Sequence, residues 1–410
     1  MSTETTGFLG WVDKRFPLTK VWNEHLAQYY APKNFNFWYF FGSLALLVLV
    51  IQIVTGIWLA MNYKPSAADA FASVEYIMRD VDWGWLIRYM HSTGASFFFI
   101  AVYLHMFRAL MYGSYRNPRE LLWIIGVIIY LAMMATAFFG YLLPWGQMSY
   151  WGAQVIVNLF AAVPGIGEDL STWVRGDYVI SDATLNRFFA FHFLLPFLLA
   201  ALVFIHIVAL HKVGSNNPDG IEIKANKDEN GIPRDGIPFH PYYTVKDIMG
   251  VTVFLAIFSA VVFFAPAMFG LFLEAPNFIP ANPLKTPEHI APVWYFTPFY
   301  AMLRAVPPMF GSQFPGVVVM FAAILVMFFL PWLDRSPVKS VRYKGPIFKI
   351  ALAILAVSFV VLGYLGLLSS TPMRTLAAQI FTTLYFAFFL LMPFYSKMEK
   401  TKPVPERVTK

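Results

Sequence analysis

The sequence contains no cysteine in its 410 residues. That absence excludes disulfide bonds, iron–sulfur ligation, thioether-attached haem and thiol chemistry, so any metal must be bound by His, Met, Tyr or carboxylate side chains. Charged residues are also scarce, at 13%, whereas 58% of the residues are hydrophobic. A soluble domain is usually about a quarter charged. The composition therefore argues against one large soluble core and indicates a protein embedded in lipid.

Long apolar stretches are abundant. A helix needs about 20 apolar residues to cross the hydrocarbon core of a membrane. Eight stretches meet this requirement: Phe37–Ala60, Tyr89–Leu110, Leu122–Leu142, Phe188–Leu210, Ile248–Phe272, Gly316–Trp332, Phe348–Leu368 and Leu376–Met398. The sequence predicts an all-α integral membrane protein whose first four spans form a four-helix bundle. We divide it into an N-terminal surface segment with the bundle (1–213), a cytoplasmic loop (214–247), and a C-terminal region of four spans with a cytoplasmic tail (248–410).

Positive charges are distributed unevenly between the two sides of these spans. Both termini and the loops on their side hold 22 of the 30 Lys and Arg, and the opposite side holds eight. Because positively charged loops remain in the cytoplasm, we expect both termini to be cytoplasmic. The net charge of +7 then reflects topology, and no nucleic-acid partner is expected. The long loops Pro144–Asn186 and Leu273–Phe314 face outward as membrane-surface caps, and no signal peptide precedes the first span.

Four of the eight histidines fall inside the predicted spans, in two pairs of equal spacing. His91 and His105 lie 14 residues apart on the second span, and His192 and His206 lie 14 apart on the fourth. Fourteen residues make nearly four helical turns, or roughly 21 Å, so the members of a pair share a face. A lone membrane histidine is often only hydrogen-bonded to a neighbouring helix. Two matched pairs instead predict two b-type haems, with His91 and His192 on the outer haem and His105 and His206 on the inner one.

Glycines repeat this spacing on the neighbouring spans. Gly42 and Gly56 lie on the first span, and Gly126 and Gly140 lie on the third. A glycine lets a flat macrocycle approach the backbone because it has no Cβ. Glycine is also common where membrane helices merely pack, so the matched spacing, rather than either pair alone, favours haem binding.

Arginines flank the histidines on the side of the nearer membrane surface. Arg88 precedes His91 by three residues, Arg108 follows His105 by three, and Arg187 precedes His192 by five. Haem propionates would point toward these surfaces, and arginine pairs well with carboxylates. For Arg187, a side chain that simply extends to the membrane interface is an equally good interpretation.

Four stretches carry a resemblance to a known family. Over nearly its whole length the chain resembles cytochrome b of the cytochrome bc1 complex, most clearly at Arg88–His91, Gly140–Ser149, Arg187–His192 and Gly214–Pro218. The split form of photosynthetic electron transport divides its helices between two chains and has one more residue between the histidines of its fourth helix. The resemblance is therefore to the unsplit, respiratory type. It implies a low-potential outer haem, a high-potential inner haem and a quinone or quinol site beside each.

The resemblance places quinol oxidation in the two outward loops. It implies a flat apolar slot formed by Tyr141, Trp151, Gly152, Pro292, Trp294, Tyr295 and Tyr300. The family's usual Pro-Glu-Trp-Tyr motif contains a glutamate that accepts a quinol proton, but this chain has Val293 at that place. We hypothesise that Glu288, together with His289, accepts the proton instead. The alternative is that Glu288 is a solvated loop charge and that water or His289 carries the proton.

The resemblance places quinone reduction near the inner ends of the first, fourth and fifth spans. It implies that His211 and Asp247 bind the quinone oxygens and supply protons, with Ser215 and Lys246 beside them. Judged from the residues alone, His211 and Asp247 would be ordinary interfacial side chains. The family often has asparagine two residues before its first glycine, whereas this chain has Phe40, so that hydrogen bond to quinone is not expected.

The residues and the resemblance together predict the catalytic haem subunit of quinol–cytochrome c oxidoreductase, a translocase of a bacterial inner membrane. Quinol oxidised outside sends one electron to an iron–sulfur partner and one through both haems to quinone inside. The implied partners are the Rieske iron–sulfur protein, cytochrome c1, a second copy in a homodimeric complex, membrane lipid, and a terminal oxidase in a supercomplex. Two alternatives stay open: a di-haem quinone-reactive membrane anchor of another respiratory enzyme, and a non-redox transporter with polar histidines.

Overall fold

The computed structural model describes residues 7–23, 27, 29–309 and 311–409, so the first six residues of the predicted N-terminal segment and residue 410 lie outside the described residues. Within these ranges, eight helical segments are long and apolar enough to cross a membrane. This confirms the predicted all-α membrane architecture. The segments contain α3 (Phe40–Ala60), α5 (Gly84–Tyr112), α6 (Glu120–Leu142), α9 (Asp182–Val213), α10 (Thr244–Phe264), α12 (Phe314–Leu325) with η8 (Val326–Phe329) and α13 (Leu330–Leu333), α14 (Pro346–Leu367) and α15 (Pro372–Leu390).

Local capping signals set where several of these helices begin. The side chain of Asn36 accepts a hydrogen bond from the backbone of Trp38, in the 3₁₀ turn η2 (Phe37–Tyr39) that leads into α3. Thr371 accepts one from the backbone of Arg374 at the start of α15, where Pro372 occupies the first turn. Such caps satisfy amide groups that have no partner inside the helix, and proline fits the first turn because its missing N–H is not needed there.

Two predicted spans end too late. The fifth was expected over Ile248–Phe272, but α10 ends at Phe264, two residues before Pro266. The eighth was expected to continue to Met398, but α15 ends at Leu390, and Met392–Met398 forms a separate helix, α16. A proline removes a helical hydrogen bond and disfavours helical backbone in the residue before it. Hydrophobicity alone does not reveal such an interruption.

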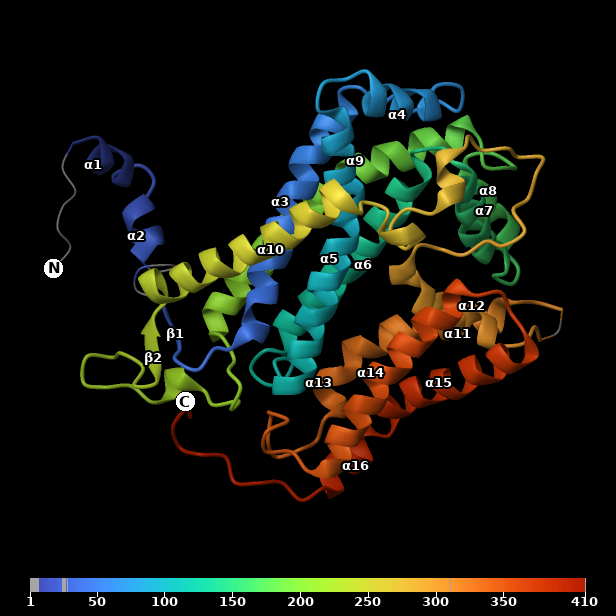
Figure 1. Ribbon diagram of the computed structural model, residues 1–410. Helices are drawn as coiled ribbons and strands as arrows, with labels where there is room; N and C mark the ends of the chain where they lie inside the picture. The colour runs from blue at the N-terminus through green and yellow to red at the C-terminus, as the bar shows by residue number, and fades with distance from the viewer. Residues whose placement is uncertain (1–6, 24–26, 28, 310, 410) are drawn as a thin grey trace.

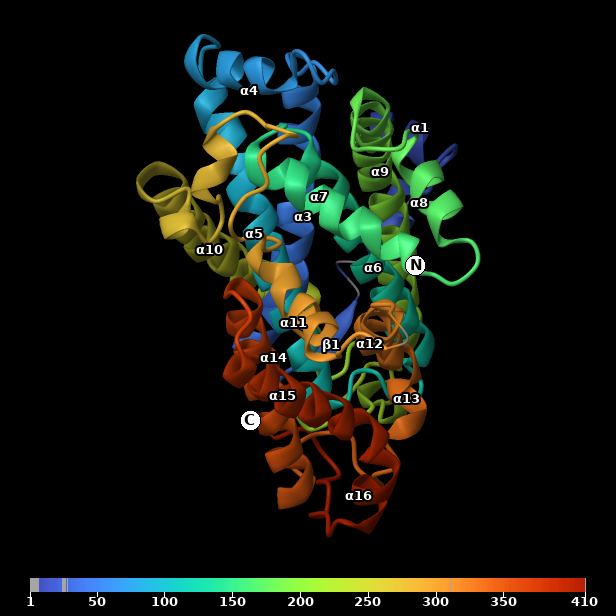
Figure 2. The ribbon, with the colours of Figure 1, turned by 90° about the vertical axis from the view of Figure 1, so that its right-hand side faces the viewer.

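The helices pack in neighbouring pairs. Helix α3 lies along α5, α6 lies along α9, and α10 lies against both α3 and α5. On the other side of this group, α11 (Thr297–Ala305) packs against α12, α14 and α15. Figures 1 and 2 show the N-terminal helices in blue to green and the C-terminal helices in orange to red as two adjoining groups. The division at residues 213 and 247 stays a prediction.

Short helices cover one end of the bundle. They are α4 (Ala70–Arg79), α7 (Gln147–Ala161) and α8 (Gly167–Arg175), and in both views they lie toward the end opposite α16 (Figures 1 and 2). The loop after α10 adds the short turns η5 (Met268–Gly270), η6 (Ala275–Phe278) and η7 (Trp294–Phe296). The two loops expected as surface caps thus contain helices, and α4 was not predicted.

The other end carries a small sheet and the C-terminal tail. Strands β1 (Tyr30–Pro32) and β2 (Gly236–Pro238) pair antiparallel. In the sequence, β1 follows α1 (Gly7–Asp13) and α2 (Leu18–Trp22), and β2 lies between η3 (Ile223–Ala225) and η4 (Phe239–Tyr243). Arg407 forms an ion pair with Asp235 at 2.8 Å, and this contact holds the pKa of Asp235 well below its usual range. Thr409 donates from its backbone to Asp219 at 2.8 Å. The N-terminal strand, the loop between α9 and α10, and the C-terminal tail therefore lie on one side.

Candidate functional site

The two outer histidines face each other across the gap between α5 and α9. The ring centroids of His91 and His192 are 6.0 Å apart, and the ring planes are nearly perpendicular, at 87°. Two imidazoles that bind one metal from opposite sides, each about 2 Å from it, have ring centroids roughly 6 Å apart. The spacing therefore fits one metal atom between the rings.

Hydrogen bonds on the far side of each ring determine which nitrogen is available. The Nδ1 atom of His192 lies 2.8 Å from the backbone oxygen of Thr136 on α6, and a carbonyl can only accept. The Nδ1 atom of His91 lies 2.9 Å from Oγ1 of Thr55 on α3, whose hydroxyl donates to the carbonyl of Ile51 at 2.6 Å. Both histidines therefore carry their proton on Nδ1, which leaves the Nε2 lone pair for a metal. Such second contacts fix the tautomer and orientation of ligating histidines.

Each of the four predicted glycines lies against one of the four histidines. A Cβ added at Gly140 would be 2.6 Å from Nδ1 of His192, and one at Gly56 would be 3.1 Å from Cε1 of His91. The inner pair has more room. A Cβ at Gly42 would be 3.2 Å from Cε1 of His105, and one at Gly126 would be 3.4 Å from Cε1 of His206. The 14-residue repeat therefore brings each glycine to its expected histidine.

The inner pair lies beside a buried arginine. The guanidinium of Arg108 is 3.3 Å from Nδ1 of His105, donates to Ser114 at 3.2 Å and lies over the ring of Tyr39. Its Nε atom is buried, and among the described residues it has no hydrogen-bond partner. The same is true of Nδ1 of His206. Buried polar atoms normally have a partner, so an unpaired arginine donor beside this pair fits a carboxylate-bearing ligand such as a haem propionate.

The outer arginines occupy different settings. Arg88 lines the same cavity as His91 and His192. Arg187 is exposed and donates a short hydrogen bond to the backbone oxygen of Trp173 on α8. The expected propionate role thus has geometric support at Arg88, whereas the contact of Arg187 favours the alternative interpretation, an interfacial side chain.

One continuous cavity of about 510 Å³ occupies the outer half of the bundle. Its wall includes both outer histidines together with Tyr141, Val293 and Tyr295. A cavity of this size and mostly apolar lining is typical of a site for a cofactor or a small apolar ligand. The predicted outer haem site and the predicted quinol site are therefore adjacent parts of one space.

Backbone and side-chain contacts join the two outward loops above this cavity. The amide of Gln147 donates to Ile279 at 3.1 Å, and the side chain of Gln147 accepts from the amide of Asn282 at 2.7 Å. Trp151 donates to the backbone oxygen of Asn282 at 3.2 Å. Gly152 lies against the ring of Tyr141, which a Cβ would approach to 3.3 Å. The glycine thus lets α7 pack directly on the tyrosine that lines the cavity.

The segment containing the predicted motif is fixed to one face of α5. Trp294 donates to the hydroxyl of Ser96 at 3.0 Å, and Tyr295 stacks on Phe99 with centroids 3.8 Å apart. The hydroxyl of Tyr103 donates to the backbone oxygen of Tyr295 at 2.6 Å. Positions 96, 99 and 103 share one helical face. Pro292 precedes the segment, and Val293 and Tyr295 are 3% and 4% exposed.

Substituting Tyr103 with phenylalanine is expected to weaken binding at the predicted quinol site without changing the spectra of the predicted haems. The change removes a buried hydrogen bond that holds Tyr295, worth about 1 kcal/mol, so KM for quinol should rise by roughly fivefold with kcat nearly unchanged. Steady-state titration with a quinol measures this. Tyr385→Phe is the matched control, because its hydroxyl donates to the backbone oxygen of Ala323 at 2.8 Å, away from the motif. Equal KM values in the two variants would contradict the positioning role of Tyr103.

Several predicted outer-site residues lie outside the cavity wall. Glu288 is exposed, and His289 donates from Nε2 to the backbone oxygen of Leu367 at 2.8 Å. Tyr300 lies under the guanidinium of Arg304. The proton-accepting role of Glu288 and His289 stays a prediction, and the exposure of Glu288 favours the solvated-charge alternative.

Sequence reasoning overlooked Glu274. This residue directly precedes η6, and its carboxylate accepts a hydrogen bond from Asn277 at 3.1 Å. The amide nitrogen of Asn277 also donates to the hydroxyl of Tyr141 at 3.2 Å. Burial raises the pKa of Glu274 to about 7, against the opposing effect of hydrogen bonds from Tyr141 and Asn277. A lone acidic residue between Leu273 and Ala275, inside a long outward loop, was the only available sequence signal.

The predicted inner-site residues are distributed around the inner ends of α3, α9 and α10. Both Ser215 and His211 contact Tyr29. The hydroxyl oxygens of Ser215 and Tyr29 are 2.9 Å apart, and the ring centroids of His211 and Tyr29 are 4.7 Å apart. Asp247 accepts from Ser43 on α3 at 3.5 Å, and Lys246 lies over the ring of Tyr243. The ring of Phe40 packs against Gly250 of α10. A Cβ atom added at Gly250 would be 3.0 Å from this ring. Whether these groups bind quinone stays a prediction.

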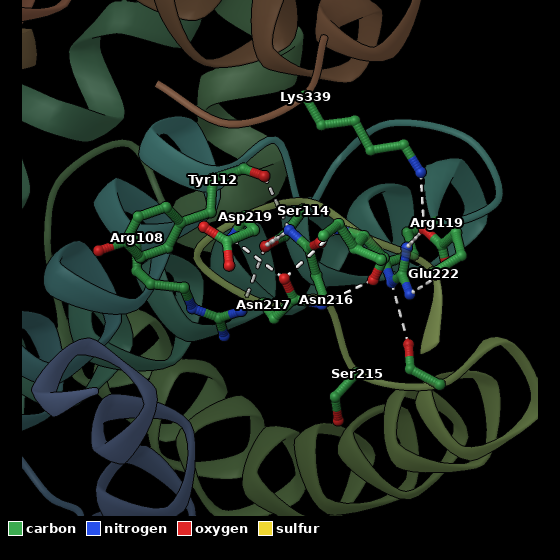
Figure 3. A network of polar contacts seen from close by, with 12 residues as sticks. Arg108, Tyr112, Ser114, Arg119, Ser215, Asn216, Asn217, Asp219, Glu222 and Lys339 are labelled. Atoms are coloured by element: carbon green, nitrogen blue, oxygen red, sulfur yellow. Dashed lines mark hydrogen bonds and ion pairs between the residues drawn. The ribbon is translucent and has the colours of Figure 1, made fainter. Parts of the chain in front are cut away.

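A polar network fixes the segment that follows α9 (Figure 3). Asn216 donates to the backbone of Tyr112 at 2.8 Å and to Ser114 at 3.1 Å, and Ser114 also contacts Arg108 (Figure 3). Arg119 is 2% exposed and binds both oxygens of the Glu222 carboxylate, at 2.6 and 2.9 Å. A bidentate arginine–carboxylate pair restricts geometry as well as adding energy. The network therefore holds the inner loop against the arginine beside the inner histidines.

Two protein-family profiles match the chain. "Cytochrome b/b6/petB" matches residues 26–214, and "Cytochrome b(C-terminal)/b6/petD" matches residues 280–386. The chain is 78% identical to cytochrome b of Allochromatium vinosum, with 100% of both chains covered. It is 52% identical to cytochrome b of Rhodospirillum rubrum, with 98% of this chain and 96% of the relative covered. A chain of the solved structure "Hyperthermophilic respiratory Complex III" is similar, with a TM-score of 0.87, 42% identity, and 96% and 99% of the two chains covered.

Proposed function

The chain belongs to the cytochrome b family, as the unsplit cytochrome b subunit of a bacterial respiratory complex III, and we propose that it holds two b haems between α5 and α9. The observation that carries this proposal is the outer histidine pair, with ring centroids 6.0 Å apart and both Nδ1 atoms engaged elsewhere. When bound, each haem supplies a one-electron carrier whose chemistry is its own, while the protein provides ligands, spacing and insulation.

In this proposal His91 and His192 are the outer ligands, and His105 and His206 are the inner ligands. Their separation along each helix, roughly 21 Å at 1.5 Å per residue, places the two sites at opposite membrane depths. Gly42, Gly56, Gly126 and Gly140 provide room beside the ligands. Arg88 and Arg108 are the proposed propionate partners. Arg88 lines the outer cavity, and Arg108 has a buried donor that finds no partner within the described part of the chain.

The outer cavity is the site we propose for quinol oxidation. Val293 and Tyr295 line it beside the outer histidines, and Tyr141 lines it with Gly152 packed behind. The apolar wall excludes water and binds a flat aromatic head group, and the few polar atoms orient it. The contacts of Ser96 and Tyr103 hold the motif segment at a fixed distance from α5.

The inner end is the site we propose for quinone reduction. His211 and Asp247 would bind the two quinone oxygens and deliver protons, because an imidazole and a carboxyl group can each hydrogen-bond a quinone oxygen and transfer a proton to it. Ser215 and Lys246 would complete this site. Uptake of protons on the inner side and release on the outer side then makes the electron transfer contribute to proton translocation.

Three further proposals concern the membrane orientation, the redox partners and the oligomeric state of this subunit. We place the chain in a bacterial inner membrane with both termini cytoplasmic, in agreement with the charge bias and with strand β1, the α9–α10 loop and the C-terminal tail lying on one side. We propose the Rieske iron–sulfur protein and cytochrome c1 as partners, since a chain without cysteine cannot ligate a Cys-bound cluster or attach a c-type haem. We also propose a homodimer, with a terminal oxidase in a supercomplex as a further partner.

Haem stoichiometry tests the proposal directly. The purified complex should yield two b haems per copy of this chain, and a redox titration of the b-type optical band should resolve two one-electron components. Quinol should reduce these components and drive cytochrome c reduction. One haem per chain, or a titration with one component, would contradict the two-site assignment. Haem reduction without cytochrome c reduction would instead favour the anchor of another respiratory enzyme.

A further inference from the structure

The motif segment of this chain cannot accept a proton through its second residue. Val293 is apolar and 3% exposed, and it lines the cavity at the place where the family's usual motif has glutamate. Oxidation of one quinol to quinone releases two electrons and two protons, and the side chain of Val293 offers no base for a proton. Glu75, the carboxylate among the cavity-lining residues, is already paired with Arg79 at 2.6 Å. Another group near the cavity must therefore accept it, if the proposed quinol site is correct.

The carboxylate of Glu274 lies next to this wall, hydrogen-bonded to two residues that line the cavity, Asn277 and Tyr141. Asn277 lines the cavity and donates from the same amide nitrogen to the Glu274 carboxylate, at 3.1 Å, and to the Tyr141 hydroxyl, at 3.2 Å. Because the Tyr141 oxygen accepts from Asn277, its own hydrogen remains available for the carboxylate of Glu274, with which it is hydrogen-bonded. Asn277 is held in turn by the backbone amide of Ser149, at 2.7 Å. The side chains of Glu274, Tyr141 and Asn277 therefore form one hydrogen-bonded cluster.

The surroundings of Glu274 favour a carboxyl that exchanges protons near neutral pH. The ionisable groups that face it are phenols, Tyr141 from α6 and Tyr295 from η7. No lysine or arginine forms an ion pair with it among the described residues. Burial raises its pKa to about 7, and a base works best when its pKa lies near the working pH. By contrast, Glu288 is exposed to solvent.

We infer that Glu274 accepts one of the two quinol protons at the outer site through the hydroxyl of Tyr141. This inference rests on the proposed function. The O–H bond of one quinol hydroxyl breaks as an O–H bond forms at the Tyr141 oxygen, and the original Tyr141 proton passes to the Glu274 carboxylate. The phenol is unchanged overall, and Glu274 gains one proton. The two electrons leave to the acceptors of the quinol–cytochrome c reaction, and the second quinol hydroxyl releases its proton to the proposed iron–sulfur partner. Glu274 is only partly buried as a residue, so it can release the proton to the outer aqueous side.

Glu274→Gln tests the inference, because it keeps the shape of the side chain and removes its basicity. We expect turnover of the purified complex to fall by about 100-fold while both b-haem bands are retained. In the unaltered protein, activity should rise with pH through about 7 as Glu274 ionises, and this rise should be absent in the variant. Glu274→Asp should keep the rise. The infrared difference spectrum between quinol-reduced and oxidised complex should show a protonated carboxyl band that Glu274→Gln lacks.

Matched variants make the result decisive. Glu168→Gln removes an exposed carboxylate on α8 and serves as the control for a change in outer charge. Tyr141→Phe should lose the same pH-dependent rise, because the relay lacks its hydroxyl. Unchanged turnover and pH profile in Glu274→Gln would overturn the inference, as would loss of the rise in Glu288→Gln alone. Failure of quinol to reduce the b haems in the unaltered protein would instead count against the proposed function.

Discussion

Substituting His192 with asparagine is expected to remove the outer b-type component from the redox titration and to leave the inner component in place. His192 has one nitrogen committed to the carbonyl of Thr136 and offers the other to the space facing His91. Asparagine is shorter and a poor haem ligand, so the site would retain one imidazole. Removing a residue that only hydrogen-bonds to a metal ligand lowers metal affinity by roughly 10- to 100-fold. Removing the ligand itself should lower the affinity by more.

The measurement is haem per chain together with the two-component titration. Haem content should fall from two to one, and quinol-driven cytochrome c reduction should be abolished, because no electron can leave the outer cavity through the membrane. His240→Asn is the control, since His240 is exposed at the start of the segment leading into α10 and contacts Thr244. Persistence of both components in the His192 variant would contradict its assignment as a ligand.

Substituting Gly140 with alanine is expected to have nearly as large an effect, although the change adds only one methyl group. The new Cβ would lie 2.6 Å from Nδ1 of His192, closer than non-bonded atoms can approach. His192 cannot yield easily, because that same nitrogen is hydrogen-bonded to Thr136 at 2.8 Å. The imidazole must therefore move, and the outer haem should be lost or bound with a displaced ligand.

Gly126→Ala is the matched control at the inner site. There the added Cβ would be 3.4 Å from Cε1 of His206, a distance that a shift of a few tenths of an ångström relieves. We expect the outer component to disappear or change its midpoint potential in Gly140→Ala, while the inner component of Gly126→Ala stays close to its original position. Equal effects at the two glycines would show that steric pressure on His192 is not the cause.

The arrangement of the four histidines could be predicted from sequence because it depends on helical periodicity. A spacing of 14 residues is nearly four turns wherever the helix lies, so His91, His105, His192 and His206 reveal their common faces without knowledge of any tertiary contact. The spans are equally visible, since lipid requires long apolar runs. Their boundaries were less visible. The two largest errors are the ends at Phe264 and Leu390, where nearby prolines interrupt helices whose hydrophobicity continues.

The outer loops could not be predicted in the same way. Glu274 and Glu288 look alike in the sequence, and only the fold distinguishes the one hydrogen-bonded beside Tyr141 from the one exposed to solvent. The contact between Arg187 and Trp173 likewise depends on how α8 folds back on α9. These are contacts between segments without a common period, so no local pattern indicates them.

The attachment of Trp294 and Tyr295 to α5 has a consequence for protein engineering. Their partners Ser96, Phe99 and Tyr103 belong to a transmembrane helix, not to the loop that forms the outer site. A loop transplanted from a distant relative would therefore meet a foreign docking surface. Loop and helix face form a single module, and a chimera that exchanges one without the other breaks it even when every residue of the loop itself is correct.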